Sequence, residues 1–233
     1  MKLNKKLSIN GVKAALESEK ITLRYMAAGT AIFQVRTGDK DEPPGGEVEF
    51  SLGWNFQNTL IKYFCGDITL ATEAGKGLFR LLCRERAARL DEPHPLALRH
   101  PTLKEVIKAY AARTGIDFIV PERPYSTRRI PAFYALGSGF HGINSLGDAF
   151  GVPDYFWQTQ GDGKVFAGSF ADSNWTGKMP AMPESFFSGA TANGKRTVSA
   201  IPALRPGVIL NGERVKEILF SGHEMVIQSM LSG

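Results

Sequence analysis

The chain has few cysteines and no long hydrophobic segment. Cys65 and Cys83 are the only two among its 233 residues, and each lies in an apolar or aromatic run. Two cysteines without a Cys-x-x-Cys spacing cannot hold a four-thiolate iron–sulfur or zinc site. Their apolar surroundings favour buried free thiols over a disulfide. No stretch approaches about 18 apolar residues, and no apolar run follows the N-terminal lysines. The sequence therefore predicts no membrane span and no signal peptide, and folding in a cytoplasm.

Charge of one sign is not concentrated anywhere. The formal net charge of +5 comes from 28 Lys and Arg against 23 Asp and Glu, and the basic residues are scattered. A nucleic-acid-binding function would rest on net charge alone, because no basic stripe is interleaved with aromatic residues. With 43% hydrophobic and 22% charged residues, the composition is that of a globular protein of one large or two small domains.

Histidines are also few and show no metal-binding spacing. The four are isolated along the chain: His94, His100, His141 and His223. Neither H-x-x-x-H nor H-E-x-x-H occurs, so no zinc site is predicted. Ser221, His223 and Glu224 are the residue types of a catalytic triad, but neighbouring residues of a strand point to opposite faces. We therefore expect His223 to be a turn residue whose partners are backbone groups.

One glycine-rich motif has the form of a dinucleotide fingerprint. Residues 137–142 match G-x-G-x-x-G, follow a possible strand and open a helical segment. A second parallel strand with a ribose-binding acid is missing, and Phe140 and His141 would crowd a pyrophosphate. The motif predicts a glycine-rich helix entry and no cofactor.

Short strand-like segments fill the first 85 residues. They are separated by turn signals such as Asn10-Gly11 and Gly66-Asp67. The expected strands are residues 2–9, 21–26, 31–36, 47–52, 60–64, 68–72 and 78–83. About seven short strands with a turn signal every 8 to 12 positions are typical of a small antiparallel barrel or sandwich. Residues 1–90 are thus predicted to form a β-barrel domain.

The C-terminal segment also reads as strands, which must join a sheet built elsewhere. Asn211-Gly212 is a strong hairpin signal between Val208–Leu210 and the apolar positions Val215, Ile218 and Phe220. An isolated hairpin buries too little apolar surface to be stable. Residues 200–233 are therefore expected to complete the N-terminal barrel.

The middle of the chain has a different pattern. Thr102 and Glu105 form a capping box before an apolar helical face, and Gly115 is the expected C-cap. A second helix is expected near residues 140–150, followed by an aromatic hairpin at 155–159 and 165–169. Residues 96–170 are predicted to form a small α+β module, and 171–199 an extended connector. The fold class is α+β, mainly β, with this module inserted into the barrel.

A polar loop between two predicted strands is the best candidate for contact with a partner. Residues 38–46 read GDKDEPPGG, and the candidate contact residues are Asp39, Asp41, Glu42, Pro43 and Pro44. Prolines stiffen the loop, so less entropy is lost when it binds. Its net negative charge contrasts with the positive chain.

The C-terminal strings RPGVILNG and FSGHEMVI resemble the end of central hub proteins from tailed bacteriophages, the Mu-type baseplate or tail hub family. LALRHPTLKEV, the segment GSGFHGINSLGDAFGVPDYFWQTQGDGKVFAG and WTGKMPAMPESFF resemble its middle part. The resemblance implies a structural protein of the virion tail tip with no catalytic residue, metal or cofactor. It also implies a homotrimeric ring that joins the tail tube to distal tail proteins such as a spike or tip protein, with host entry as the wider process. The resemblance also implies synthesis and assembly in the host cytoplasm.

An alternative function of a different class remains open: a module that binds or cleaves peptidoglycan or another carbohydrate. The aromatic residues of the hairpin could stack on sugar rings, although a core role is favoured. These are Tyr155, Phe156, Trp157 and Phe166. A glycosidase also needs a pair of carboxylates. The candidates are Glu122, Asp148, Asp154 and Asp162.

Overall fold

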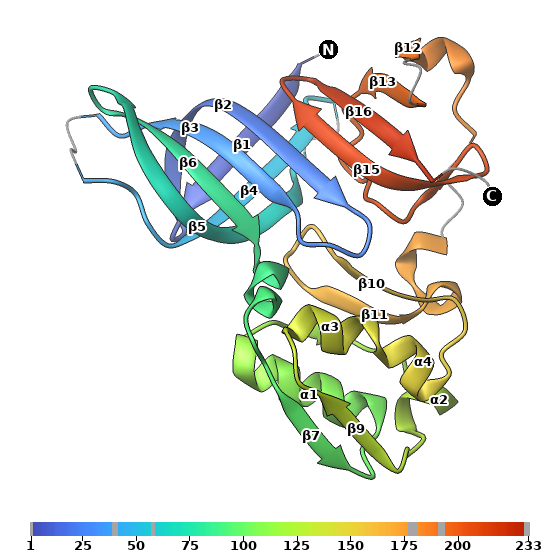
Figure 1. Cartoon of the computed structure of the whole chain (residues 1–233). Coiled ribbons are helices and arrows are strands. Elements are labelled where there is room, and N and C mark those ends of the chain that lie inside the picture. Colours follow the sequence, from blue (N-terminus) through green and yellow to red (C-terminus); the bar gives the residue numbers. More distant parts are fainter. Residues whose placement is uncertain (1, 39–41, 57–58, 177–180, 191–193, 231–233) are drawn as a thin grey trace. The chain divides into compact units, whose positions relative to one another are not determined.

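The computed structural model of the protein describes residues 2–38, 42–56, 59–176, 181–190 and 194–230 (Figure 1). The chain divides into two compact units. The first comprises Met1–Arg86, Gly161–Gly163 and Lys178–Gly233, and the second comprises Ala87–Gln160 and Lys164–Gly177. The C-terminal segment thus belongs to the same unit as the N-terminal strands.

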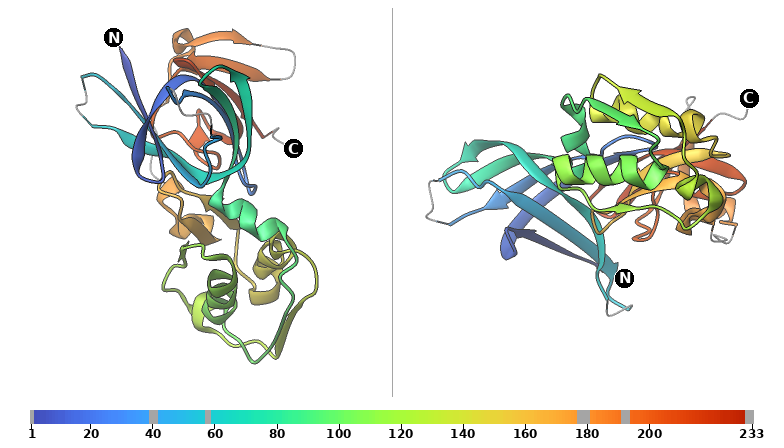
Figure 2. Two further views of the ribbon diagram at one scale, coloured as in Figure 1. Left: turned by 90° about the vertical axis from the view of Figure 1, so that its left-hand side faces the viewer. Right: turned by 90° about the horizontal axis from the view of Figure 1, so that it is seen from below.

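The first unit is built on an 11-stranded sheet. Its strands are β1 (Leu3–Ile9), β2 (Val12–Arg24), β3 (Thr30–Arg36), β4 (Glu47–Trp54), β5 (Ile61–Gly75), β6 (Leu78–Glu85), β12 (Phe187–Ala190), β13 (Lys195–Ser199), β14 (Ile209–Leu210), β15 (Glu213–Ser221) and β16 (Glu224–Ser229). The path runs β1-β4-β5-β6-β3-β2-β15-β16-β13-β12, and β1 also pairs with β2. The pairing therefore closes a ring through β1, β4, β5, β6, β3 and β2 (Figure 2).

Strand β2 belongs to both the ring and the C-terminal strands. Its first residues pair with β1, for example Ala14 with Leu7. Its last residues pair with β15, for example Leu23 with Ile218. The prediction that the C-terminal strands complete the N-terminal sheet is confirmed.

Aromatic side chains from the ring and from the C-terminal strands share one core. The ring centroid of Phe33 lies 5.6 Å from that of Phe50 and 6.0 Å from that of Phe64. Phe220 of β15 lies 6.0 Å from Phe50 and 5.8 Å from Tyr63. Since all five are fully buried, removing β15 would leave a cavity in the ring.

Two hairpins form as their Asn-Gly signals predict. Asn10 and Gly11 have φ values of 50° and 79°, and Asn211 and Gly212 have 50° and 85°. Positive φ at both central residues is the type I′ geometry, which matches the right-handed twist of the strands.

A buried ion pair joins the segment before β14 to the ring. Strand β5 carries a bulge opposite Phe50 and Ser51, which leaves Tyr63 outside the ladder register. The Arg205 guanidinium donates to the Tyr63 carbonyl and lies 2.8 Å from a Glu85 carboxylate oxygen. The other Glu85 oxygen accepts the Gly29 N–H at 2.7 Å. The arginine thus satisfies the carbonyl that the bulge releases.

The second unit combines short helices with two small sheets. Its elements are η1 (Arg86–Asp91), β7 (Leu96–Arg99), α1 (Leu103–Thr114), β8 (Phe118–Ile119), α2 (Pro124–Thr127), β9 (Ala132–Ala135), α3 (Gly139–Asn144), α4 (Leu146–Phe150), β10 (Tyr155–Thr159), β11 (Val165–Ser169), η2 (Phe170–Asp172) and η3 (Asn174–Thr176). One sheet has the order β10-β11-β8 and the other pairs β7 with β9. The predicted capping box of α1 is present, and Gly115 is its left-handed C-cap.

The prediction of an extended connector over 171–199 is wrong for its second half. Strand β13 pairs with β16, and β12 pairs with β13 at the edge of the main sheet, after the short helix η4 (Glu184–Phe186). Each strand is only four or five residues long. An alternation of apolar and polar residues over so few positions is hard to distinguish from a loop in the sequence. These residues form strands because β16 provides an edge for β13 to pair with.

Two further boundaries differ from expectation. Residues 60–64 and 68–72 were expected as separate strands but form the single strand β5. Gly66 pairs within the sheet, and a Cβ there would lie 2.1 Å from the Arg84 carbonyl oxygen, so the glycine allows close strand packing instead of a turn. The helix expected at 140–150 is divided at Ser145 into α3 and α4.

Candidate functional site

The predicted contact loop lies between β3 and β4. Asp39 and Asp41 fall outside the described residues. Glu42 and Pro43 are exposed, and Pro44 is half-buried. The C-terminal end of the loop is fixed by Asn10, whose side chain donates to the Gly45 carbonyl at 2.9 Å and accepts the Glu47 N–H at 2.9 Å. The loop is therefore anchored at the end of β1, beside the β1–β2 turn.

A cleft lies at the opposite end of β1, where the ring meets the β15–β16 turn. It has a volume of about 410 Å³ and is lined by Lys2, Leu3, Lys5, Trp54, Gly222 and His223. We call it the Trp54 cleft. The Trp54 indole N–H donates to the Ala200 carbonyl at 2.9 Å, and this hydrogen bond fixes the orientation of the indole. Leu3 pairs with Trp54 across β1 and β4, so the cleft forms where these two strands end.

A buried carboxylate stabilises one wall of the Trp54 cleft. Glu19 has a side chain only 3% exposed and lies 2.6 Å from the Lys5 ammonium. It also accepts the Gly222 N–H at 3.0 Å. The Lys5 ammonium lies 5.6 Å from the centroid of the Phe220 ring. Glu19 therefore offsets the charge of Lys5, while Lys2 and His223 also line the cleft.

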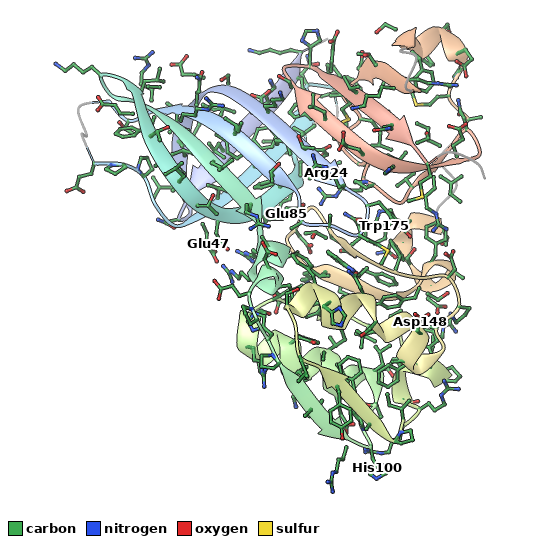
Figure 3. The ribbon with its side chains drawn as sticks, in the orientation of Figure 1. Arg24, Glu47, Glu85, His100, Asp148 and Trp175 are labelled. Carbon is green, nitrogen blue, oxygen red and sulfur yellow. The ribbon has the colours of Figure 1, made fainter. Side chains whose placement is uncertain are left out.

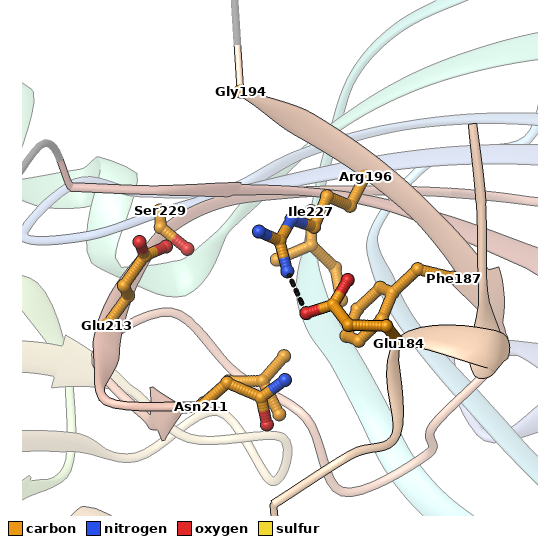
Figure 4. A pocket seen from close by; sticks show the side chains of 9 residues that line it. Glu184, Phe187, Gly194, Arg196, Asn211, Glu213, Ile227 and Ser229 are labelled. Carbon is orange, nitrogen blue, oxygen red and sulfur yellow. Dashed lines mark hydrogen bonds and ion pairs between the residues drawn. The ribbon is translucent and has the colours of Figure 1, made fainter. Parts of the chain in front are cut away.

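A smaller pocket of about 90 Å³ lies among the C-terminal strands (Figure 4). The Arg196 guanidinium lies 2.9 Å from the Glu184 carboxylate and 5.4 Å from the Phe187 ring centroid. The Asn211 amide exchanges two hydrogen bonds with the Met182 backbone. These polar groups are already paired within the chain, so their role here is to hold the segments around the pocket together.

The glycine-rich motif is a packing feature. A Cβ at Gly142 would lie 1.7 Å from the Tyr110 hydroxyl oxygen, and one at Gly139 would lie 2.7 Å from Leu90. Ser138 is the N-cap of α3 and accepts the His141 N–H. The glycines allow α3 to approach its neighbours closely, which agrees with the interpretation of a glycine-rich helix entry.

The histidines are dispersed and the triad residues do not converge. The Ser221 hydroxyl donates to the Glu19 carbonyl, while His223 is an exposed turn residue that lines the Trp54 cleft. His94 contacts the Arg89 carbonyl in the second unit, and His100 follows β7 (Figure 3). Across the described ranges, no group of three or more His, Cys, Asp and Glu side chains has a metal-binding arrangement.

Three of the four aromatic residues of the hairpin are buried in the core, and Tyr155 is half-buried. Phe156 and Trp157 are fully buried and Phe166 is 3% exposed. Phe156 packs edge-on against Trp175, with centroids 5.5 Å apart, and the Trp157 indole donates to the Asn144 side chain. Of the candidate acids, Glu122 is ion-paired with Lys104, and Asp148 lies on α4 (Figure 3). The three buried aromatic side chains therefore offer no exposed ring face on which a sugar could stack.

The cysteines are free and buried. Burial raises the pKa of Cys65 to about 11 and that of Cys83 to about 12. Both thiols therefore stay protonated near neutral pH, and neither is an activated nucleophile.

The Trp54 cleft was not predicted from the sequence. Its residues come from the N-terminus, the end of β4 and the β15–β16 turn, which are brought together only by strand pairing. The burial of the Glu19 carboxylate was not predicted either, because an acidic residue in a strand ordinarily faces solvent.

Comparisons with known proteins identify the fold. No family model matches the chain. It is 31% identical over 227 residues to an uncharacterised 58.7 kDa protein in the lys 3′ region of Haemophilus phage HP1 (strain HP1c1). The alignment covers 97% of this chain but 42% of that protein, so the chain spans less than half of this curated relative.

Solved structures of tail proteins share the architecture over nearly the whole chain. The 43 kDa tail protein of prophage MuSo2 from Shewanella oneidensis matches with a TM-score of 0.68 at 12% identity, covering 99% of this chain and 98% of that one. A tail protein from Neisseria meningitidis MC58 also gives 0.68 at 12% identity, covering 100% and 98%. The Escherichia coli c3393 protein, a component of the type VI secretion system, gives 0.62 at 10% identity, covering 98% and 77%.

These similarities define the class of fold: that of phage tail proteins and of a related secretion-system component. No helix in the described ranges has both the length and the apolar character needed to cross a bilayer.

Proposed function

We propose that this chain is a structural subunit of a bacteriophage tail tip or baseplate hub. It forms a ring, with a homotrimer as the proposed state, that connects the tail tube to distal tail proteins such as a spike or tip protein. It is proposed to reside at the virion tail tip after assembly in the host cytoplasm. The observation that carries the proposal is the match of almost the full chain to almost the full length of two tail proteins.

The geometry of the first unit is consistent with a mechanical role. The ring closes by strand pairing, and the same sheet continues without a break into β15, β16, β13 and β12. The Arg205–Glu85 ion pair and the Trp54–Ala200 hydrogen bond tie the C-terminal segment to the ring at two further places. A load applied to the C-terminal strands would therefore be shared by many backbone hydrogen bonds.

Heterologous contacts produce such a ring when the rotation between copies closes. A trimer would have three times the chain mass of 25.5 kDa. Multi-angle light scattering of the purified protein measures this mass directly. A monomeric mass at every concentration at which tails assemble would contradict the ring.

The test of the tail role uses a phage that carries the gene. We expect deletion of the coding segment to give particles whose tails lack a tip or do not assemble, with loss of infectivity. Supplying the wild-type chain in trans is the control, and it should restore both. Electron microscopy of purified particles provides the readout. Normal tails and normal titre after deletion would show that the chain has no structural role there.

A further inference from the structure

The contact loop and the Trp54 cleft are complementary in charge. Among the described residues, the Glu42 carboxylate has no cationic partner and the Lys2 ammonium has no carboxylate partner. Glu42 is exposed at one end of the ring, and Lys2 lines the cleft at the other, next to His223. The loop therefore presents a negative charge and the Trp54 cleft presents a positive one.

The two surfaces also fit each other in shape: the loop is an extended proline segment and the cleft is a groove with an aromatic wall. Glu42 and Pro43 each precede a proline, which excludes the helical region and favours an extended, polyproline-like backbone. Proline-rich segments of that form dock into grooves with an aromatic wall. The indole of Trp54 forms such a wall in a cleft of about 410 Å³.

The loop cannot reach the cleft of its own chain. Strand β1 has 7 residues between the two surfaces, which corresponds to about 20 Å at roughly 3.3 Å per residue. The loop is anchored at Gly45 by Asn10, beside the far end of β1. From that anchor, the three residues back to Glu42 extend at most about 10 Å. A contact between the loop and a Trp54 cleft must therefore join two copies of the chain.

We propose that Glu42, Pro43 and Pro44 of one copy dock into the Trp54 cleft of the next copy. The Glu42 carboxylate pairs with Lys2 and His223, and the prolines pack against Trp54. The contact is heterologous, because opposite ends of the ring strands meet, so it generates a closed ring or a filament. It rests on the proposed tail function and names the surface through which the subunits of that ring associate.

Site-specific cross-linking between copies tests the contact. Pro43→Cys and His223→Cys place single reactive thiols on the two surfaces, while Cys65 and Cys83 are buried. Mixing the two variants with a short bis-maleimide should give a covalent dimer, whereas either variant alone should give none. The matched control replaces His223→Cys by Lys108→Cys, an exposed position on α1. A dimer yield no higher than this control would overturn the proposal.

Charge reversal then tests the pairing. Lys2→Glu in the cleft variant, or Glu42→Lys in the loop variant, should each reduce the cross-link yield about two- to fivefold, as expected for a solvent-exposed ion pair. Mixing the two reversed variants should restore the yield, and added salt should reduce the yield of the Pro43→Cys and His223→Cys pair without charge reversals. Reversals that leave the yield unchanged would overturn the ion pair between Glu42 and Lys2.

The outcomes also separate this contact from the tail function. If light scattering shows an oligomer while the cross-link fails, the contact is wrong and the tail role stands. If the cross-link forms but deletion of the gene leaves tails intact, the contact is right and the tail role is wrong.

Discussion

The buried ion pair between Arg205 and Glu85 makes a sharp test of how the C-terminal segment holds the ring. The side chains of Arg205 and Glu85 are 8% and 1% exposed, so water cannot solvate either charge. Arg205→Met keeps much of the aliphatic volume but leaves the Glu85 carboxylate buried without its arginine. It also removes the donor to the Tyr63 carbonyl. Breaking one side of a buried pair costs about 3–5 kcal/mol.

We therefore expect Arg205→Met to lower the free energy of unfolding of the first unit by about 3–5 kcal/mol. Glu85→Gln in the same chain should recover part of the loss, because a neutral amide is cheaper to bury and its oxygen can still accept the Gly29 N–H. The control is Arg36→Met, which removes an exposed pair with Glu17 whose side chains are 55% and 47% exposed. That change should cost at most about 1 kcal/mol.

Amide hydrogen exchange is the suitable assay, because it reports on one unit at a time. Peptides that cover β5 and β6 give the free energy of opening of the ring in each variant. A loss for Arg205→Met no larger than that for Arg36→Met would refute the reasoning that this pair is a buried joint.

Three further outcomes follow from the structure. Cys65 and Cys83 should react with a thiol reagent near pH 8 only after denaturation, because burial raises their pKa values to about 11 and 12; fast labelling of the native protein would contradict this. Truncation from Val208 removes Phe220 from the core and should let the amides of β2 to β6 exchange quickly, and retained protection would show that the ring is stable alone. The Thr102 backbone N–H holds the pKa of Glu105 below its usual value, so Glu105→Ala should destabilise the protein near pH 7. That difference should vanish in thermal melts as the pH falls through the lowered pKa of Glu105, and a difference that persists at low pH would exclude the carboxylate as its source.

Local signals in the sequence predicted local structure well. Asn10-Gly11, Asn211-Gly212 and the capping box at Thr102 each act through the backbone of their own few residues, so no distant part of the chain is needed. The coarser part of the resemblance, a likeness to phage tail proteins, also agreed with the fold.

Long-range pairing set the features that the sequence did not reveal. The first seven residues of β2 are all exposed or half-buried, so no buried face marks them as a strand. β12 and β13 are strands because β16 offers an edge. The Trp54 cleft combines three segments, so no spacing in the sequence indicates it.

The double membership of β2 also has a consequence for synthesis of the chain. Arg24 and its partner Glu217 are 193 residues apart. At a synthesis rate of about 5–20 residues per second, β15 is made roughly 10–40 s after β2, and the edge of β2 that pairs with β15 is unpaired during that time. During that time an open strand edge can pair with another nascent chain. Lys20 and Arg24, which lie on that edge, give it a positive charge that opposes pairing with an identical edge until the C-terminal strands arrive.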